Sequence, residues 1–178
     1  MSKKKNSKCE YESERPTKGS FRASDGARVE YFELGNKDKP TVLISPAFTG
    51  SAELYVEKFG SALSEYRVIG IELRGHGKGG GCKFKGHPYC SGEQAPDKGK
   101  YFGFRIERLA ADVHEAITQL DLPKKVVLMG HSLGGNVLYS FVSQYGTKAL
   151  SGLFIYDQSP KNLAVGTAEN ARFPLYAS

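Results

Sequence analysis

The chain has 178 residues, 39% of them hydrophobic, and a net charge of +6, a composition that indicates one soluble globular domain. No apolar run approaches the roughly 20 residues of a membrane-spanning helix, and the basic amino terminus lacks the apolar core of a secretory signal. We therefore expect a cytoplasmic protein without a membrane span. The basic segments at residues 3–8 and 78–100 carry no base-stacking motif, so nucleic acid is not an expected partner.

The cysteines give no sign of a disulfide framework or a metal centre. Their number is odd, and no signal peptide accompanies them. Cys82, His87 and Cys90 lie close together, but their Cys-x4-His-x2-Cys spacing matches no common zinc site and a fourth ligand is not evident. We expect neither a metal nor a cofactor.

The amino-terminal part predicts a tail followed by a hairpin. Residues 1–19 are basic, lack apolar periodicity and are predicted to be a disordered tail, whereas residues 20–178 form one domain. Residues 21–24 and 27–34 contain strand-forming side chains on either side of Asp25-Gly26. Such a dipeptide between strands predicts an antiparallel hairpin with a two-residue turn.

From residue 41 onward, short apolar strands alternate with helix-length segments. Strands are predicted at residues 41–44, 67–71, 125–129 and 153–156, and helices at 52–66, 106–120 and from 133 onward. Continuous apolar strands indicate burial on both faces, which is typical of parallel sheets covered by helices. The pattern predicts an α/β fold with a mostly parallel sheet and the antiparallel hairpin at one edge. His114 falls on the predicted solvent-facing side of its helix.

A glycine-rich basic segment at about residues 78–103 interrupts this alternation. Lys78 and the three glycines at 79–81 resemble a phosphate loop, but the Gly-x4-Gly-Lys-Ser/Thr pattern is absent. We interpret the segment as a surface loop inserted in the domain.

Residues 125–142 predict a strand, a sharp turn and a helix, with Ser132 at the centre of Gly130-His131-Ser132-Leu133-Gly134. Such an elbow strains its central residue and needs small residues two positions before and after it, as Gly130 and Gly134 are. It exposes the serine hydroxyl at the carboxyl end of the sheet, where the helix dipole favours negative charge. Ser132 is therefore a candidate nucleophile, although a serine that only caps a helix is the alternative.

The chain resembles the amino-terminal two-thirds of an α/β-hydrolase of the esterase, lipase and peroxidase-like kind. Four segments carry the resemblance in the expected order: residues 44–51 after the third strand, Leu73-Arg74-Gly75-His76-Gly77, the elbow at 130–135, and Asp157-Gln158-Ser159-Pro160 after the sixth strand. The resemblance implies a three-layer sandwich from which the carboxyl-terminal strands are missing.

The resemblance also implies roles for individual residues. The backbone N–H groups of Phe48 and Leu133 would form the oxyanion hole, although Pro46-Ala47 replaces the family's usual His-Gly. His76 is expected to be structural. Related epoxide hydrolases and dehalogenases carry aspartate at the elbow, so Ser132 indicates acyl transfer from a small-molecule carboxylic ester or thioester.

The rest of a catalytic triad is harder to place. Asp157 occupies a position that some families use for the acid, but no histidine follows it along the chain. Two hypotheses stay open: a serine ester hydrolase, with stand-alone activity in question, and a truncated or non-catalytic homologue that acts as a binding module. Without further strands, residues 153–156 would form an exposed sheet edge, which favours self-association or aggregation.

Overall fold

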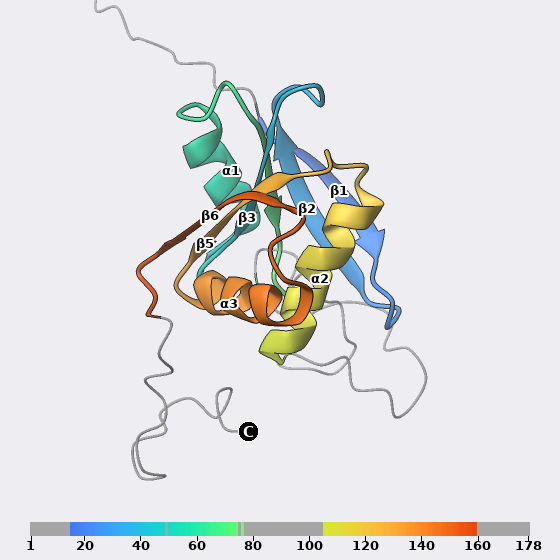
Figure 1. The fold of residues 1–178 in the computed structure, drawn as a ribbon. Coiled ribbons are helices and arrows are strands. Elements are labelled where there is room, and N and C mark those ends of the chain that lie inside the picture. Colours follow the sequence, from blue (N-terminus) through green and yellow to red (C-terminus); the bar gives the residue numbers. More distant parts are fainter. Residues whose placement is uncertain (1–14, 49, 75, 77–104, 160–178) are drawn as a thin grey trace, which may run out of the picture.

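The computed structural model describes residues 15–48, 50–74, 76 and 105–159 (Figure 1). Residues 1–14 of the expected tail, the expected insertion at 78–103 and residues 160–178 lie outside the described residues. The elements are β1 (Thr17–Arg22), β2 (Arg28–Leu34), β3 (Thr41–Ser45), α1 (Ala52–Gly60), β4 (Arg67–Ile71), α2 (Ile106–Gln119), β5 (Val126–His131), α3 (Leu133–Tyr145) and β6 (Leu150–Tyr156).

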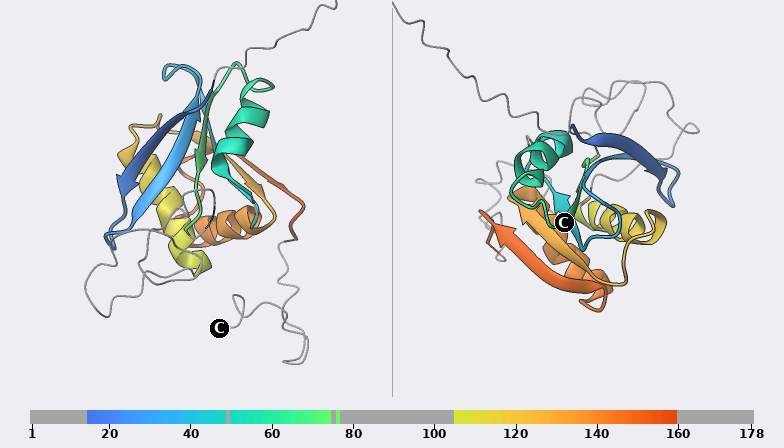
Figure 2. Two further views of the ribbon diagram at one scale, coloured as in Figure 1. Left: turned by 180° about the vertical axis from the view of Figure 1, so that it is seen from behind. Right: turned by 90° about the horizontal axis from the view of Figure 1, so that it is seen from above.

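The sheet confirms the predicted fold class. Its described strands run in the order β1-β2-β4-β3-β5-β6, with β1 antiparallel to β2 and β2 antiparallel to β4. The strands β4, β3, β5 and β6 are parallel to one another. Helix α1 covers one face, while α2 and α3 cover the other (Figure 2). The result is a three-layer arrangement in which the carboxyl ends of the parallel strands meet at one edge.

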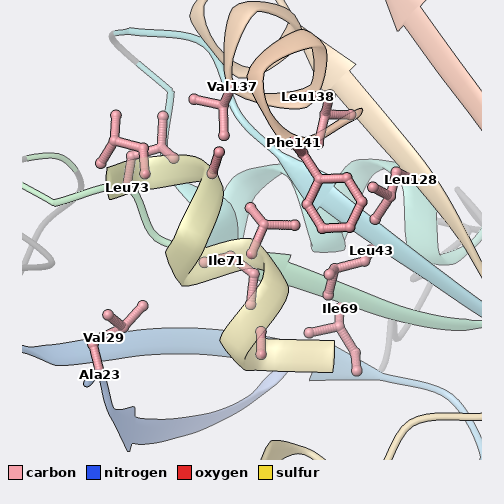
Figure 3. Close-up of a cluster of buried hydrophobic side chains, with 14 of the residues drawn as sticks. Ala23, Val29, Leu43, Ile69, Ile71, Leu73, Leu128, Val137, Leu138 and Phe141 are labelled. Atoms are coloured by element: carbon pink, nitrogen blue, oxygen red, sulfur yellow. The ribbon is translucent and has the colours of Figure 1, made fainter. Parts of the chain in front are cut away.

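Each face of the sheet has its own hydrophobic core. Leu43, Ile69 and Leu128 point toward α2 and α3, where they pack with Leu138 and Phe141 (Figure 3). Their strand neighbours point the other way and pack beneath α1; these include Val42, Ile44 and Val68. Because successive strand residues face opposite sides, a strand can be apolar throughout only when both sides are covered.

The amino-terminal hairpin differs from the prediction at both its ends. Strand β1 begins at Thr17, inside the segment that we expected to be a tail. The turn is longer than Asp25-Gly26, because Arg22 still pairs with Arg28 and residues 23–27 form the connection. Asp25 accepts the Ala27 N–H at 3.1 Å and also bonds Arg74, so this carboxylate organises a wider turn.

The helical spacing predicted that His114 faces solvent, and this prediction is wrong. Its ring stacks on Tyr145 of α3, with ring centroids 4.0 Å apart and an angle of 13° between the planes. Phe141 lies beside it at 6.2 Å. The aromatic side chains of α3 therefore extend the contact between the two helices beyond the apolar stripe of α2.

In the described part of the chain the sheet ends at β6. Two of its large side chains, Leu153 and Phe154, are 42% and 55% exposed. They lie on the outer strand, as expected for an uncovered edge, and self-association through it stays a prediction. Within the described ranges, no helix combines the length and the apolarity needed to cross a bilayer.

Candidate active site

Ser132 lies at the junction of β5 and α3 with a strained backbone. Its φ of 50° and ψ of −114° fall in a region that non-glycine residues seldom adopt and that costs about 1–3 kcal/mol. The Ser132 N–H donates to the Tyr156 carbonyl oxygen at 3.2 Å, which fixes the turn against the end of β6. Strain of this kind is often retained at functional sites.

Gly130 and Gly134 permit the close approach of chain segments at this turn. A Cβ atom on Gly134 would lie 1.9 Å from the carbonyl oxygen of Ser45 and 2.7 Å from that of Pro46. A Cβ atom on Gly130 would lie 2.8 Å from the carbonyl oxygen of Gly134. The loop between β3 and α1, which we call the β3–α1 loop (residues 46–51), is therefore packed directly on the first turn of α3.

The two amides expected to form an oxyanion hole belong to these adjoining segments. Leu133 is the first residue of α3, and Phe48 lies in the β3–α1 loop. Within the described residues neither amide N–H donates a hydrogen bond. The loop is folded into a turn by a bond of 2.9 Å from the Gly50 N–H to the Ala47 carbonyl oxygen. The oxyanion role of these two amides stays a prediction.

His131 links the elbow to Asp157 and to α1. Its Nδ1 is hydrogen-bonded to the Tyr55 hydroxyl, and its Nε2 lies 3.4 Å from Asp157 Oδ2. The ring also stacks on Tyr156, with centroids 4.3 Å apart and planes 8° apart. Burial and the neighbouring Tyr55 raise the pKa of Tyr156 to about 12. Sequence reasoning identified Asp157 but missed Tyr55, because no local signal connects α1 with the elbow.

A cavity of about 400 Å³ opens between α1 and the ends of β5 and β6. Apolar and aromatic side chains contribute much of its wall, including Leu54, Tyr55, Phe59 and Tyr156. His131 lines it as well, whereas Ser132 does not. The cavity therefore lies beside the elbow, on the α1 side of the sheet.

Arg74 anchors the turn that follows β4. Its guanidinium is completely buried and donates to both carboxylate oxygens of Asp112, at 2.6 and 2.7 Å, and to Asp25 at 3.0 Å. Burial alone would lower the pKa of Arg74, but these carboxylates raise it above its ordinary value. The network joins the turn to α2 and to the amino-terminal hairpin.

His76 completes this turn in the structural role that we expected. Its Nδ1 lies 2.8 Å from the Arg74 carbonyl oxygen, and burial lowers the pKa of the imidazole. The ring packs edge-on against Phe48, with centroids 5.1 Å apart and an angle of 80°. The turn held by Arg74 thus contacts the β3–α1 loop at Phe48.

Glu72 holds the carboxyl end of the β3–α1 loop, a role that no sequence motif indicated. Both of its carboxylate oxygens lie 3.3 Å from the Ala52 amide at the start of α1. The side chain is buried, and burial raises its pKa to about 7; Glu30 adds to the rise, while hydrogen bonds from Ala52 and Ser51 and the charge of Lys18 oppose it. A buried carboxyl group that titrates near neutral pH therefore holds the first turn of α1.

The described residues hold no group of three potential metal ligands. Cys82, His87 and Cys90 lie outside the described residues.

A comparison with protein families agrees with this geometry. The family model described as the alpha/beta hydrolase fold matches residues 40–175, which include the β3–α1 loop, the elbow and Asp157. The chain belongs to the alpha/beta hydrolase family. The resemblance inferred from four short segments is thereby confirmed.

Known members of the alpha/beta hydrolase family resemble the chain over much of its length. A Bacillus subtilis (strain 168) protein provisionally named 2-succinyl-6-hydroxy-2,4-cyclohexadiene-1-carboxylate synthase is 30% identical over 137 residues, which are 77% of this chain and 43% of that protein. Epoxide hydrolase 4 of Mus musculus is 26% identical over 64% of this chain and 27% of its own length. An esterase from Exiguobacterium antarcticum has a similar structure, with a TM-score of 0.57, 25% identity, and coverage of 76% and 43% of the two chains. The chain spans less than half the length of each.

The raised pKa of Glu72 predicts a pH-dependent stability. Between its ordinary value of 4.5 and about 7 the folded chain retains a proton that the unfolded chain has released, so the free energy of unfolding falls as the pH rises through this interval. We expect wild type to lose on the order of 3 kcal/mol across it and Glu72→Gln to lose much less. Urea unfolding at a series of pH values measures the difference.

Glu57→Gln provides the matched control for this prediction. Glu57 is an exposed carboxylate on α1, so the same replacement there leaves the buried Glu72 site unaltered. We expect its pH profile to follow that of wild type. A Glu72→Gln profile that also follows wild type would show that Glu72 remains ionised in the folded chain.

Proposed function

We propose that Ser132 is the nucleophile of a hydrolase that acts on a small-molecule carboxylic ester or thioester. The observation that carries the proposal is the strained backbone of Ser132 at a strand-to-helix junction, with φ at 50°. This conformation is maintained although glycine would adopt it at lower cost. A helix-capping role gives no reason for the strain, because Ser132 makes no side-chain capping bond to α3.

In the proposed reaction Ser132 Oγ attacks the carbonyl carbon of the ester. An Oγ–carbon bond forms while the hydroxyl proton passes to a general base, and the resulting oxyanion accepts hydrogen bonds from the Phe48 and Leu133 amides. Each such donor contributes on the order of 3 kcal/mol to transition-state stabilisation. The alcohol or thiol then leaves with a proton, and attack by water on the acyl-serine releases the acid and restores Ser132.

The elbow residue favours ester chemistry over epoxide opening. One relative carries the name of an epoxide hydrolase. Such enzymes resemble this fold but place an aspartate at the elbow, where its carboxylate forms an ester with the opened epoxide. This chain has a serine at that position, and an alkoxide generated from serine is suited to attack on an acyl carbon.

A binding module without turnover is a second candidate. It is supported by the hydrogen bonds and ring contacts of the described histidines, which engage groups other than Ser132. His76 bonds the Arg74 carbonyl, and His114 stacks on Tyr145. His131 is held between Tyr55 and Asp157. None of these three is bonded to Ser132 in the described part of the chain, so a general base is not assigned among them.

Covalent labelling separates the two candidates. We expect a fluorophosphonate probe to add one phosphonyl group to Ser132, because an activated serine attacks phosphorus as it attacks an acyl carbon. Mass spectrometry of the labelled peptide identifies the site. Ser132→Ala should reduce labelling by at least about 100-fold.

The matched control is Ser143→Ala, which removes an exposed serine hydroxyl from α3 without touching the elbow. It should be labelled as wild type is. Labelling that persists in Ser132→Ala would disprove the nucleophile assignment. A wild-type chain that binds an apolar ester but is never labelled would support the binding module instead.

A further inference from the structure

A chain of hydrogen bonds runs from the β3–α1 loop through α1 to the elbow. The Ala47 N–H donates to the Tyr55 hydroxyl oxygen at 3.4 Å. The same hydroxyl is bonded to His131 Nδ1, and His131 Nε2 lies 3.4 Å from Asp157 Oδ2. Four segments of the protein therefore meet in one continuous path beside Ser132.

Donors and acceptors match along the whole path. The two lone pairs of the Tyr55 oxygen can accept the Ala47 N–H and the neighbouring Tyr156 hydroxyl, while the Tyr55 proton is donated to His131 Nδ1. A neutral imidazole that accepts at Nδ1 carries its proton at Nε2, which then donates to the Asp157 carboxylate. One tautomer of His131 satisfies every bond.

Steric contacts keep Tyr55 and His131 in place. A Cβ atom on Gly50 would lie 2.7 Å from Tyr55 Cε2, so the tyrosine ring lies directly on the turn of the loop. Tyr156 stacks on one face of the imidazole. The His131 side chain is 26% exposed whereas that of Asp157 is 81% exposed, so the bond to Tyr55 is the sheltered one and Asp157 forms the weaker outer end.

We propose that Tyr55 and His131 are positioning residues that hold the Phe48 amide in register with Ser132. Ala47 directly precedes Phe48, and His131 directly precedes Ser132, so the path joins the backbones on both sides of the reacting centre. Productive geometry requires placement within about 0.5 Å, which short loops seldom provide unaided. The catalytic consequence of this positioning rests on the proposed function. The contacts themselves do not depend on it.

Tyr55→Phe tests the proposal, because it removes the hydroxyl and leaves the ring. We expect hydrogen exchange of the Ala47 amide, followed by NMR, to become about tenfold faster, as expected for a lost bond of about 1.4 kcal/mol. We expect the rate of fluorophosphonate labelling at Ser132 to fall about tenfold as well, because the oxyanion donor is displaced. Tyr145→Phe, which removes a hydroxyl on α3, should change neither rate.

Variants of His131 distinguish positioning from general packing. His131→Asn retains an acceptor near the position of Nδ1 and should keep most of the wild-type exchange protection at Ala47, whereas His131→Ala should match Tyr55→Phe. Imidazole ¹⁵N shifts of the wild type should report the proton on Nε2.

Two results would overturn the proposal: exchange at Ala47 in Tyr55→Phe equal to that in Tyr145→Phe, or a proton on Nδ1 of His131. If wild type is never labelled, the proposed function fails. Amide exchange and the tautomer still decide whether Tyr55 and His131 hold the loop.

Discussion

We expect the free energy of unfolding of the Arg74→Met variant to be about 3–5 kcal/mol lower than that of wild type. Arg74 is fully buried, and its loss leaves the Asp112 carboxylate, which is only 4% exposed, without its bidentate partner. Arg108 still contacts Asp112 at 2.9 Å, but it is itself shared with Glu115. Urea unfolding followed by far-ultraviolet circular dichroism measures the change.

Two further variants establish the cause of this loss. Arg28→Met removes an exposed arginine from β2 and should alter the free energy of unfolding by less than about 0.5 kcal/mol. Asp112→Leu added to Arg74→Met removes the stranded carboxylate and should recover part of the stability. A double variant no more stable than Arg74→Met would instead indicate that the lost guanidinium contacts, rather than the unpaired carboxylate, cause the destabilisation.

The parallel part of the sheet could be predicted from the sequence because burial on both faces leaves a strong signal. Strand β4 has the predicted bounds, and β3 is longer by Ser45 alone. Both strands are buried at every position, so their polar residues occur only at the strand ends and the apolar run between them is easy to recognise. The outer strand β6 begins at Leu150, earlier than predicted, because polar Ser151 is tolerated on an exposed strand.

The strained turn was predictable for a different reason. The turn at Ser132 needs glycine two residues before and two residues after it, so the steric requirement is visible in a short stretch of sequence. The close contact of Gly134 with Ser45 shows why glycine is required there. The nucleophilic role of Ser132 and the oxyanion role of Phe48 and Leu133 stay proposals, since they depend on chemistry rather than on backbone shape.

The supporting interactions could not be predicted, because they join residues that are distant in the sequence. Tyr55 and His131 are 76 positions apart, and Glu72 meets Ala52 across 20 positions. A tyrosine in an amphipathic helix or a glutamate after a strand resembles many surface residues. Their function depends on which elements become neighbours, which only the folded chain shows.

Gly134→Ala is expected to lower both stability and labelling at Ser132. The added methyl group would lie 1.9 Å from the Ser45 carbonyl oxygen, and backbone atoms cannot turn away as a side chain can. Either α3 or the β3–α1 loop must shift, and overpacking of this kind costs about 1–3 kcal/mol or more. The same shift moves Phe48 relative to Ser132, so we expect labelling to fall about 100-fold. Urea unfolding and the initial rate of fluorophosphonate labelling provide the two measurements.

Gly152→Ala separates this effect from glycine replacement in general. Gly152 lies in β6, and a Cβ atom there would make ordinary contacts with Val127 at 3.5 and 3.7 Å. Alanine also suits a strand better than glycine, so stability should be equal or slightly higher and labelling unchanged. If Gly134→Ala is labelled as fast as Gly152→Ala, the close approach of the β3–α1 loop to the elbow is not needed for the reactivity of Ser132. If only labelling falls while stability is retained, the loop has moved without unfolding, which is the behaviour expected when Ser132 depends on an oxyanion donor from that loop.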